Sequence, residues 1–211
     1  MLFRSTGGKQ ILYRDGVPYA ELSFRQAVQR EDGMEVLDAA IHWNEQGVYL
    51  EAERALLLEH RIRFLKRVAI GTDGSTELSL EAPVEYLDGI LKGAGRASLS
   101  QGSRVLRGSG FVVDVDAQRV LIQDDVSLTD GTDGQIAATS QYAVVDLRLE
   151  SVDLLSKVRF SLHQSGAMWT GETDVLNLGP RGAITIGGKS IIHKEGLRIS
   201  GIRILLAPHQ N

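Results

Sequence analysis

The stretch GSGFVVDVDAQRVLIQDDVSLTDG, residues 108–131, alternates apolar side chains with polar or smaller ones. Phe111, Val113 and Val115 form one set, and their neighbours form the other. A period of two places one set on a buried face of a β-strand and the other set in solvent. The stretch ends in a Val-x-Leu step, Val126–Leu128, followed by an Asp-Gly turn. It therefore predicts two short strands joined by a bend and closed by a glycine-containing turn.

Val-x-Leu steps of this kind recur along the chain. They begin at Val68, Ala97, Val126 and Val158, at intervals of 29, 29 and 32 residues, with a looser fifth copy at Ser190. A unit of about 30 residues is therefore repeated. The residue inside each step is small or polar, as an outward position requires: Ala69, Ser98, Ser127 and Arg159.

Residues 48–70, VYLEAERALLLEHRIRFLKRVAI, also fit a second pattern. The stretch holds no Gly or Pro and is rich in strong helix formers. Read alone, it fits an amphipathic helix with Leu58, Ile62 and Leu65 on one face. The register of the repeat favours two strands with a bend near Glu59 and His60, and we predict strands.

Composition limits the class of protein. The chain has 211 residues, 43% of them hydrophobic, and a formal net charge of −4. It is long enough to bury a core as one extended domain or two small ones. An acidic chain lacks the basic surface that nucleic-acid binding requires. No apolar run approaches the roughly 18 residues of a membrane span, and the first ten residues do not resemble a signal peptide.

No catalytic or metal-binding constellation is found in the sequence. There are no cysteines, and the five histidines show no metal-ligand spacing. Asp114 and Asp116 are interpreted as solvated strand residues. The stretch GGKS at 187–190 lacks the first glycine of a phosphate-binding loop. The basic run HRIRFLKR, residues 60–67, fits a solvated outer face, or else a contact with lipid phosphates or an acidic partner. We predict no enzymatic activity, no cofactor and no metal.

Valine, isoleucine, leucine and alanine dominate the repeat positions, and aromatic residues make up only 6% of the chain. Such a lining either fills a dry core or surrounds a groove fitted to a long aliphatic ligand.

Three segments carry a resemblance to a known family: residues 16–33, residues 48–74 and above all LRGSGFVVDVDAQRVLIQDDVSL, residues 106–128. They resemble the periplasmic domain of the LptC family of lipopolysaccharide-transport proteins, to which LptA and the OstA-like domains are related. The resemblance covers residues 9–131, while residues 132–211 look like additional LptA-like units. We expect a single elongated domain over residues 1–211.

The resemblance implies an all-β fold, a twisted antiparallel β-jelly roll of two-strand units that is open at both ends. It implies a periplasmic carrier that binds lipopolysaccharide acyl chains in its interior and needs no enzymatic activity. The resemblance implies a periplasmic location, with an anchor to the inner membrane through an N-terminal helix that is not part of the given sequence. Whether the role is LptC-like or LptA-like stays open. The interior residues expected to bind lipid are Val68, Ile70, Leu99, Phe111, Val113, Val126, Leu128 and Phe160.

The expected partners are lipopolysaccharide, an inner-membrane ABC transporter complex and an LptA-like protein. The C-terminal segment is strongly β-forming and little protected by charge or proline, so we expect its edge to pair with the LptA-like partner through Ile199, Ile202 and Ile204. The main alternative is a structural β-solenoid scaffold with a closed, packed interior. A carbohydrate-active jelly-roll enzyme is disfavoured, because no pair of carboxylates is predicted on an inward face.

Overall fold

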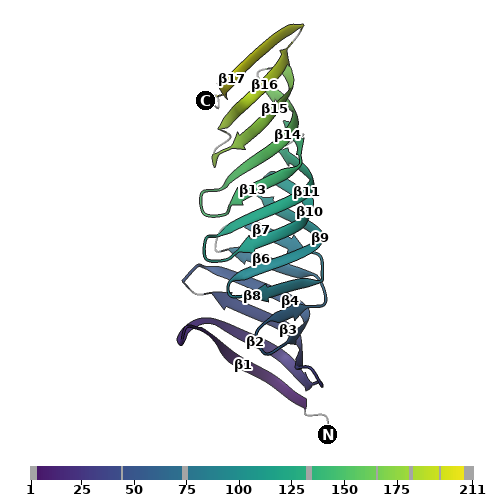
Figure 1. The fold of residues 1–211 in the computed structure, drawn as a ribbon, viewed down its shortest axis with the longest axis vertical. Coiled ribbons are helices and arrows are strands. Elements are labelled where there is room, and N and C mark those ends of the chain that lie inside the picture. Colours follow the sequence, from purple (N-terminus) through teal and green to yellow (C-terminus); the bar gives the residue numbers. More distant parts are fainter. Residues whose placement is uncertain are drawn as a thin grey trace. The chain divides into compact units, whose positions relative to one another are not determined.

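The computed structural model describes residues 4–43, 45–72, 76–131, 135–164, 166–180, 183–194 and 196–206 (Figure 1). These residues form antiparallel β-strands, and none of them lies in an α-helix. The prediction of an all-β antiparallel protein is therefore confirmed. No helix that could cross a membrane occurs in the described ranges.

The chain divides into two compact units. The first comprises residues 1–99 and 110–117, and the second comprises residues 100–109 and 118–211. The single domain expected over residues 1–211 stays a prediction. The first unit holds β1 (Arg4–Arg14), β2 (Val17–Gln29), β3 (Met34–Trp43), β4 (Val48–Leu57), β5 (Ile62–Phe64), β6 (Val68–Thr72), β7 (Thr76–Leu80) and β8 (Val84–Leu87). Strands β9 (Ile90–Gln101) and β10 (Arg104–Asp114) contribute residues to both units. The second unit holds β11 (Arg119–Asp130), β12 (Ile136–Ser140), β13 (Tyr142–Asp146), β14 (Ser151–Gln164), β15 (Ala167–Leu178), β16 (Ile184–Lys194) and β17 (Leu197–Leu206).

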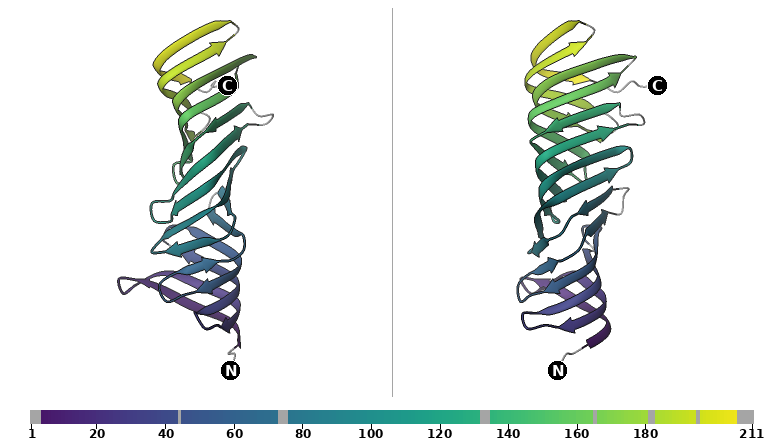
Figure 2. Two further views of the ribbon diagram at one scale, coloured as in Figure 1. Left: turned by 45° about the vertical axis from the view of Figure 1, so that its right-hand side comes forward. Right: turned by 90° about the vertical axis from the view of Figure 1, so that its right-hand side faces the viewer.

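Several strands are the two halves of one longer, bent strand. The first half of β4 pairs with β6 and its second half pairs with β5. The N–H of Leu65, between β5 and β6, donates to the carbonyl of Arg54 at 3.0 Å and so continues the ladder across the bend. In the second unit β12 and β13 are likewise two halves of one strand between β11 and β14, and Gln141 bridges their bend with a 3.1 Å bond to Ser156. The curvature of these strands is visible in Figure 2.

Residues in the left-handed backbone region mark the bends. Glycine tolerates a positive φ without steric cost, and aspartate adopts it more often than most residues. Lys157 (φ 50°) follows Ser156 (φ 62°) at the bend of β14, and here two ordinary side chains adopt the strained conformation. The other mid-strand positions with positive φ are Gly7, Asp38, Gly110, Asp125 and Gly188.

Residues 48–70 form strands β4, β5 and the start of β6, so the prediction of strands over this stretch is confirmed. Residues 58–61 connect β4 to β5 at the expected position near Glu59 and His60, and a second bend at 65–67 separates β5 from β6. Strong helix formers are overridden here because alternate residues are buried along β4. The five Val-x-Leu steps lie on β6, β9, β11, β14 and β16.

Gly108 allows a close approach of two backbones. A Cβ atom at this position would lie 2.8 Å from the carbonyl oxygen of Asp124 and 2.5 Å from a methyl carbon of Ile122. Gly110, two residues later, has φ 62° and bends β10. The sequence interpretation of these glycines as positions of close approach or bending is therefore confirmed.

We predict that Gly108→Ala destabilises the protein by about 1–3 kcal/mol, because the added methyl group is forced against a backbone carbonyl that cannot move cheaply. The control is Gly187→Ala on β16, where the new Cβ would meet only Val175 at 3.7 Å. It should change stability by less than about 1 kcal/mol. Urea unfolding followed by circular dichroism measures both, and equal effects would contradict the close-approach role of Gly108.

Candidate functional site

The eight residues predicted to line the interior are all buried, at most 6% exposed. Within the Val-x-Leu steps, the intervening Ser127 and Arg159 are exposed, and Ala69 and Ser98 are half-buried. We call the buried set of alternating residues in each unit its inner face. Contact of this face with acyl chains stays a prediction. The eight residues are Val68, Ile70, Leu99, Phe111, Val113, Val126, Leu128 and Phe160.

Successive hairpin turns alternate between the two ends of the strands. Each unit therefore has two rows of turns, which we call its two edges. In the first unit the β1–β2 and β3–β4 turns lie on one edge, and the β4–β5, β8–β9 and β10–β11 turns lie on the other. Side chains from the two edges nevertheless contact each other. Trp43, at the end of β3, packs edge-on against Tyr86 of β8 with ring centroids 5.6 Å apart. We call the line along which the two edges of a unit meet its seam.

A polar cluster holds the seam of the first unit. Arg14 from the β1–β2 turn forms an ion pair with Asp116 from the β10–β11 turn. The hydroxyl of Tyr19 donates to the same carboxylate at 2.8 Å, and Gln46 donates to it at 3.3 Å. The Arg14 guanidinium lies over the Tyr19 ring, 3.7 Å from its centroid. We call Arg14, Tyr19 and Asp116 the seam clasp.

The charges of the clasp are mutually stabilised. Burial alone would raise the pKa of Asp116, but hydrogen bonds from Arg14 and Tyr19 outweigh it and hold that pKa below its ordinary value. Burial also raises the pKa of the Tyr19 hydroxyl, and the nearby Asp116 charge adds to this effect. The clasp is therefore an arginine cation, an aspartate anion and a neutral tyrosine donor at neutral pH.

One donor of the clasp is unused. The Nη2 atom of Arg14 is buried and has no hydrogen-bond partner among the described residues. It occupies space that a side chain at Gly89 would fill, since a Cβ there would lie 2.4 Å from Nη2. A buried guanidinium donor without an acceptor is costly, so this atom weakens the clasp.

A cleft of about 550 Å³ opens in the seam beside the clasp. It lies between the β1–β2 hairpin and the β4–β5 and β8–β9 turns, and Figure 2 (left) shows that hairpin extending beyond its neighbours. Leu22 and Ile62, both buried residues of the inner face, contribute to the lining. The rim includes three basic residues, Arg14, His60 and Arg61. We call this space the seam cleft, and it joins an apolar floor to a rim that carries these basic residues and two carboxylates, Glu59 and Asp88.

The basic run at 60–67 is only partly solvated. Glu85 accepts a 2.8 Å hydrogen bond from Arg63 and lies 3.5 Å from Arg61. The bond from Arg63 lowers the pKa of Glu85. Arg67 donates to the Ser79 hydroxyl at 2.6 Å. Of this run, His60 and Arg61 line the seam cleft.

A buried arginine spans the seam of the second unit. Arg104 is paired with Asp130 at 3.1 Å on its own edge. Its guanidinium also donates to the carbonyls of Glu150 at 3.0 Å and Gly179 at 3.3 Å, which belong to turns of the opposite edge. All three contacts are charge-assisted, so this side chain ties the two edges of the unit together.

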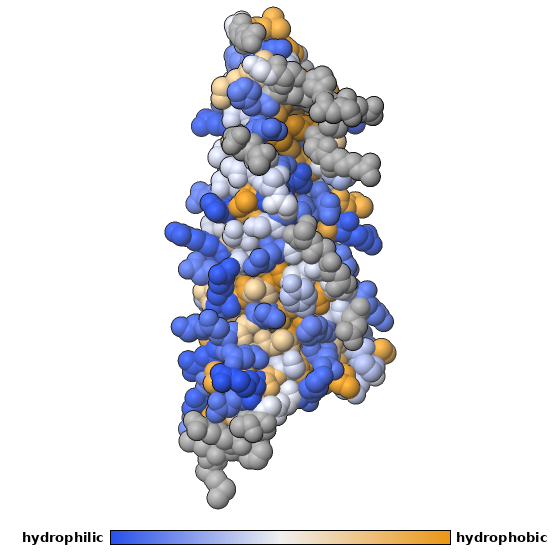
Figure 3. All heavy atoms as spheres, turned by 180° about the vertical axis from the view of Figure 1, so that it is seen from behind, coloured by the Kyte–Doolittle hydropathy of each residue, from blue (hydrophilic) through white to orange (hydrophobic). Residues whose placement is uncertain are grey.

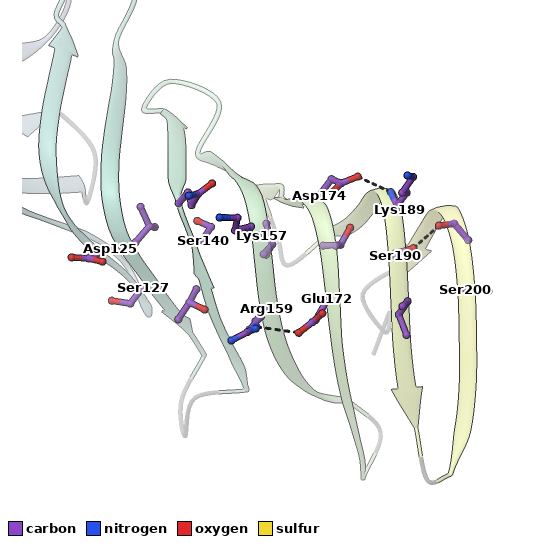
Figure 4. A pocket seen from close by; sticks show the side chains of 17 residues that line it. Asp125, Ser127, Ser140, Lys157, Arg159, Glu172, Asp174, Lys189, Ser190 and Ser200 are labelled. Carbon is purple, nitrogen blue, oxygen red and sulfur yellow. Dashed lines mark hydrogen bonds and ion pairs between the residues drawn. The ribbon is translucent and has the colours of Figure 1, made fainter.

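A groove of about 1010 Å³ crosses the surface of the second unit from β11 to β17, and its lining includes the buried Val126 and Val158 as well as polar side chains. Arg159 and Glu172 point toward each other from β14 and β15, 3.1 Å apart (Figure 4). Asp174 accepts the backbone N–H of Lys189 at 2.9 Å. Acidic and basic side chains alternate along the groove, so it has no dominant charge. Hydrophilic side chains also cover most of the face drawn in Figure 3.

The predicted partner edge lies on β17, which pairs with β16 and forms the last strand of its unit in Figure 1. Ile199 and Ile204 are half-buried on this strand. The backbone of Ile202 lies in β17, but its side chain is outside the described part of the structure.

Sequence reasoning missed the seam clasp. Asp116 was interpreted as a solvated strand residue, whereas it follows β10 and binds Arg14 and Tyr19. Its partners lie 102 and 97 residues away, so no local signal indicated them. The stretch GGKS lies within β16, as expected for a strand. No group of three or more potential metal ligands occurs in the described ranges.

Comparison with the known protein families and with curated proteins found no match to this chain.

We predict that Asp116→Asn destabilises the first unit by about 1 kcal/mol at pH 7, since the ion pair is partly exposed and screened. The pKa of Asp116 is lower in the folded state, so its contribution is complete above about pH 4 and is lost as pH falls through the folded-state pKa. The difference in the free energy of unfolding between wild type and variant should therefore become smaller as the pH is lowered. Urea unfolding between pH 2 and pH 7 measures it.

The control is Asp114→Asn, which keeps an oxygen to accept the N–H of Ala117. It should leave stability and its pH dependence unchanged. An effect of Asp116→Asn that does not vary with pH would refute the electrostatic role of the clasp.

Proposed function

We propose that this protein is a non-enzymatic carrier that holds lipid acyl chains against its inner face. The seam cleft supports this most directly, because two buried residues of that face, Leu22 and Ile62, lie directly beneath it. Its volume lies within the roughly 300–1,000 Å³ of typical ligand pockets. The rival scaffold function requires an interior closed on all sides, and the cleft favours the carrier.

The chemistry of the inner face suits this role. Aliphatic side chains bind a hydrocarbon chain without directional bonds, and each buried methylene contributes about 0.8 kcal/mol to the free energy of binding. A chain of about ten methylenes would be held firmly enough to carry and weakly enough to release. The clasp and Arg104, by contrast, place polar contacts at the edges of each unit.

The proposal extends to lipopolysaccharide as the cargo and to the periplasm as the location, on the strength of the resemblance to the LptC family. It includes an open antiparallel β-jelly roll as the form of the carrier. Its partners are an inner-membrane ABC transporter complex and an LptA-like protein that pairs with β17. A terminal strand exposes backbone donors and acceptors to which such a partner adds its own strand.

We predict that photo-crosslinking amino acids at Leu128 and Phe160 capture lipopolysaccharide, whereas those at Ser127 and Arg159 do not. The two pairs occupy neighbouring positions on β11 and β14 but face opposite sides. Capture is read from the mobility shift and an anti-lipopolysaccharide blot. Equal capture by both pairs would contradict the assignment of the inner face, and no capture at Leu128 or Phe160 would favour the packed scaffold.

We predict that the double variant Ile202→Pro, Ile204→Pro abolishes head-to-tail association or binding to an LptA-like protein, because proline removes backbone donors from β17. The control replaces both residues by threonine, which keeps the donors and the strand propensity. Analytical ultracentrifugation and pull-down measure association, and circular dichroism checks the fold. Normal association of the folded proline variant would exclude this edge as the docking surface.

A further inference from the structure

We propose that the seam cleft of the first unit binds the anionic headgroup of an amphiphile, with Arg14 as its main contact and the acyl chain lying over Leu22 and Ile62. This inference rests on the proposed carrier function, and it adds the headgroup class and the point of entry. The ligand is defined by one compact anionic group, a phosphate or a carboxylate, joined to a hydrocarbon chain.

The fixed position of Arg14 at the wall of the cleft carries the argument. Asp116 and Tyr19 hold the guanidinium in place, yet Nη2 is buried without an acceptor in the described part of the chain. The residue also lines the cleft. An arginine side chain binds oxyanions through its N–H groups, and 31% of the Arg14 side chain is exposed, so the fixed guanidinium can meet an oxyanion in the cleft.

Arg61 is the second basic contact. It shares Glu85 with Arg63, but Arg63 makes the closer contact, 2.8 Å against 3.5 Å. Arg61 is therefore loosely held and lies on the same cleft as Arg14. Glu59, 3.7 Å from His60, and Asp88 also lie on the rim. These carboxylates disfavour an extended polyanion and favour one compact headgroup set between the two arginines.

The β1–β2 hairpin supplies an apolar approach to the same cleft. Ile11 and Tyr13 line it and are 50% and 63% exposed, and Val17 on the turn is 64% exposed. Large apolar side chains gathered at the mouth of a cleft mark an interaction site. Here they cover the part of a hydrocarbon chain that leaves the inner face, while Arg14 meets its charged end.

Isothermal titration calorimetry with matched probes tests the proposal. The probes are monododecyl phosphate, dodecyl maltoside and inorganic phosphate, with both detergents below their critical micelle concentrations. The first probe has a charged headgroup and a chain, the second has a chain with an uncharged headgroup, and the third is the anion alone. Their affinities therefore separate the contributions of headgroup and chain to binding. We expect wild type to bind monododecyl phosphate roughly tenfold or more tightly than dodecyl maltoside, as one charge-assisted hydrogen bond provides. Inorganic phosphate should bind far more weakly than either.

The variants are Arg14→Gln and Arg61→Gln, with Arg25→Gln as the control. Arg25 is also an exposed arginine paired with an aspartate, Asp38, but it does not line the cleft. The two cleft variants should lose most of the preference for phosphate and keep their affinity for dodecyl maltoside, and Arg25→Gln should behave as wild type. If Arg14→Gln fails to fold, Arg14→Lys replaces it, because lysine keeps the charge but lacks the fork.

Three results would overturn the proposal. The first is equal affinity of wild type for the two detergents. The second is a loss of preference in Arg25→Gln as large as in the cleft variants. The third is tight binding of inorganic phosphate alone, which would identify an anion site without a chain. If neither detergent binds to wild type, the carrier function itself fails, whereas binding of dodecyl maltoside without a phosphate preference removes only the headgroup site.

Discussion

An antiparallel ladder with one apolar face has to cover that face, and this protein does so by bending its strands near the middle. A flat hairpin would leave residues such as Leu22 and Val126 in water. Some bends use a left-handed backbone residue, such as Gly110 or Asp125, and others are spanned by a hydrogen bond, such as that from Leu65 to Arg54. Once the strands bend, the two edges of a unit meet. The seam, its clasp and its cleft all follow from this geometry.

The inner face could be predicted from the sequence because its signal is local. Phe111 and Val113 identify their side of β10 by alternation alone, and the Val-x-Leu steps extend that register along the chain. The seam could not be predicted. Arg104, next to a Gly-Ser turn, has the local pattern of a surface residue, yet it is 8% exposed because turns from the opposite edge cover it. Lys157 gives no sign of its left-handed backbone, because lysine is not a residue that the bend favours.

The two kinds of contact in each unit suit two different parts of an amphiphile. Dispersion and hydrophobic contacts on the inner face are non-directional, so a hydrocarbon chain can slide along them without breaking any specific bond. The guanidinium of Arg14 at the seam bonds directionally, and under the proposed function it would fix a charged end in place. Segregation of this kind lets one end of a ligand be oriented while the other end remains free to move. The neutral mixture of charges in the groove of the second unit provides neither property.

The distance along the chain between clasp partners also orders the folding process. Neighbouring strands are joined by contacts such as Lys9–Glu21, 12 residues apart, whereas Arg14 and Asp116 are 102 residues apart. Closing the longer loop costs roughly 2 kcal/mol more in chain entropy, at about 0.6 kcal/mol for each doubling of length. Hairpins therefore form first and pair with one another, and the clasp forms only after β10 has joined the sheet. During synthesis the nascent first unit emerges with its apolar face uncovered, so the period of greatest aggregation risk ends when Asp116 reaches Arg14.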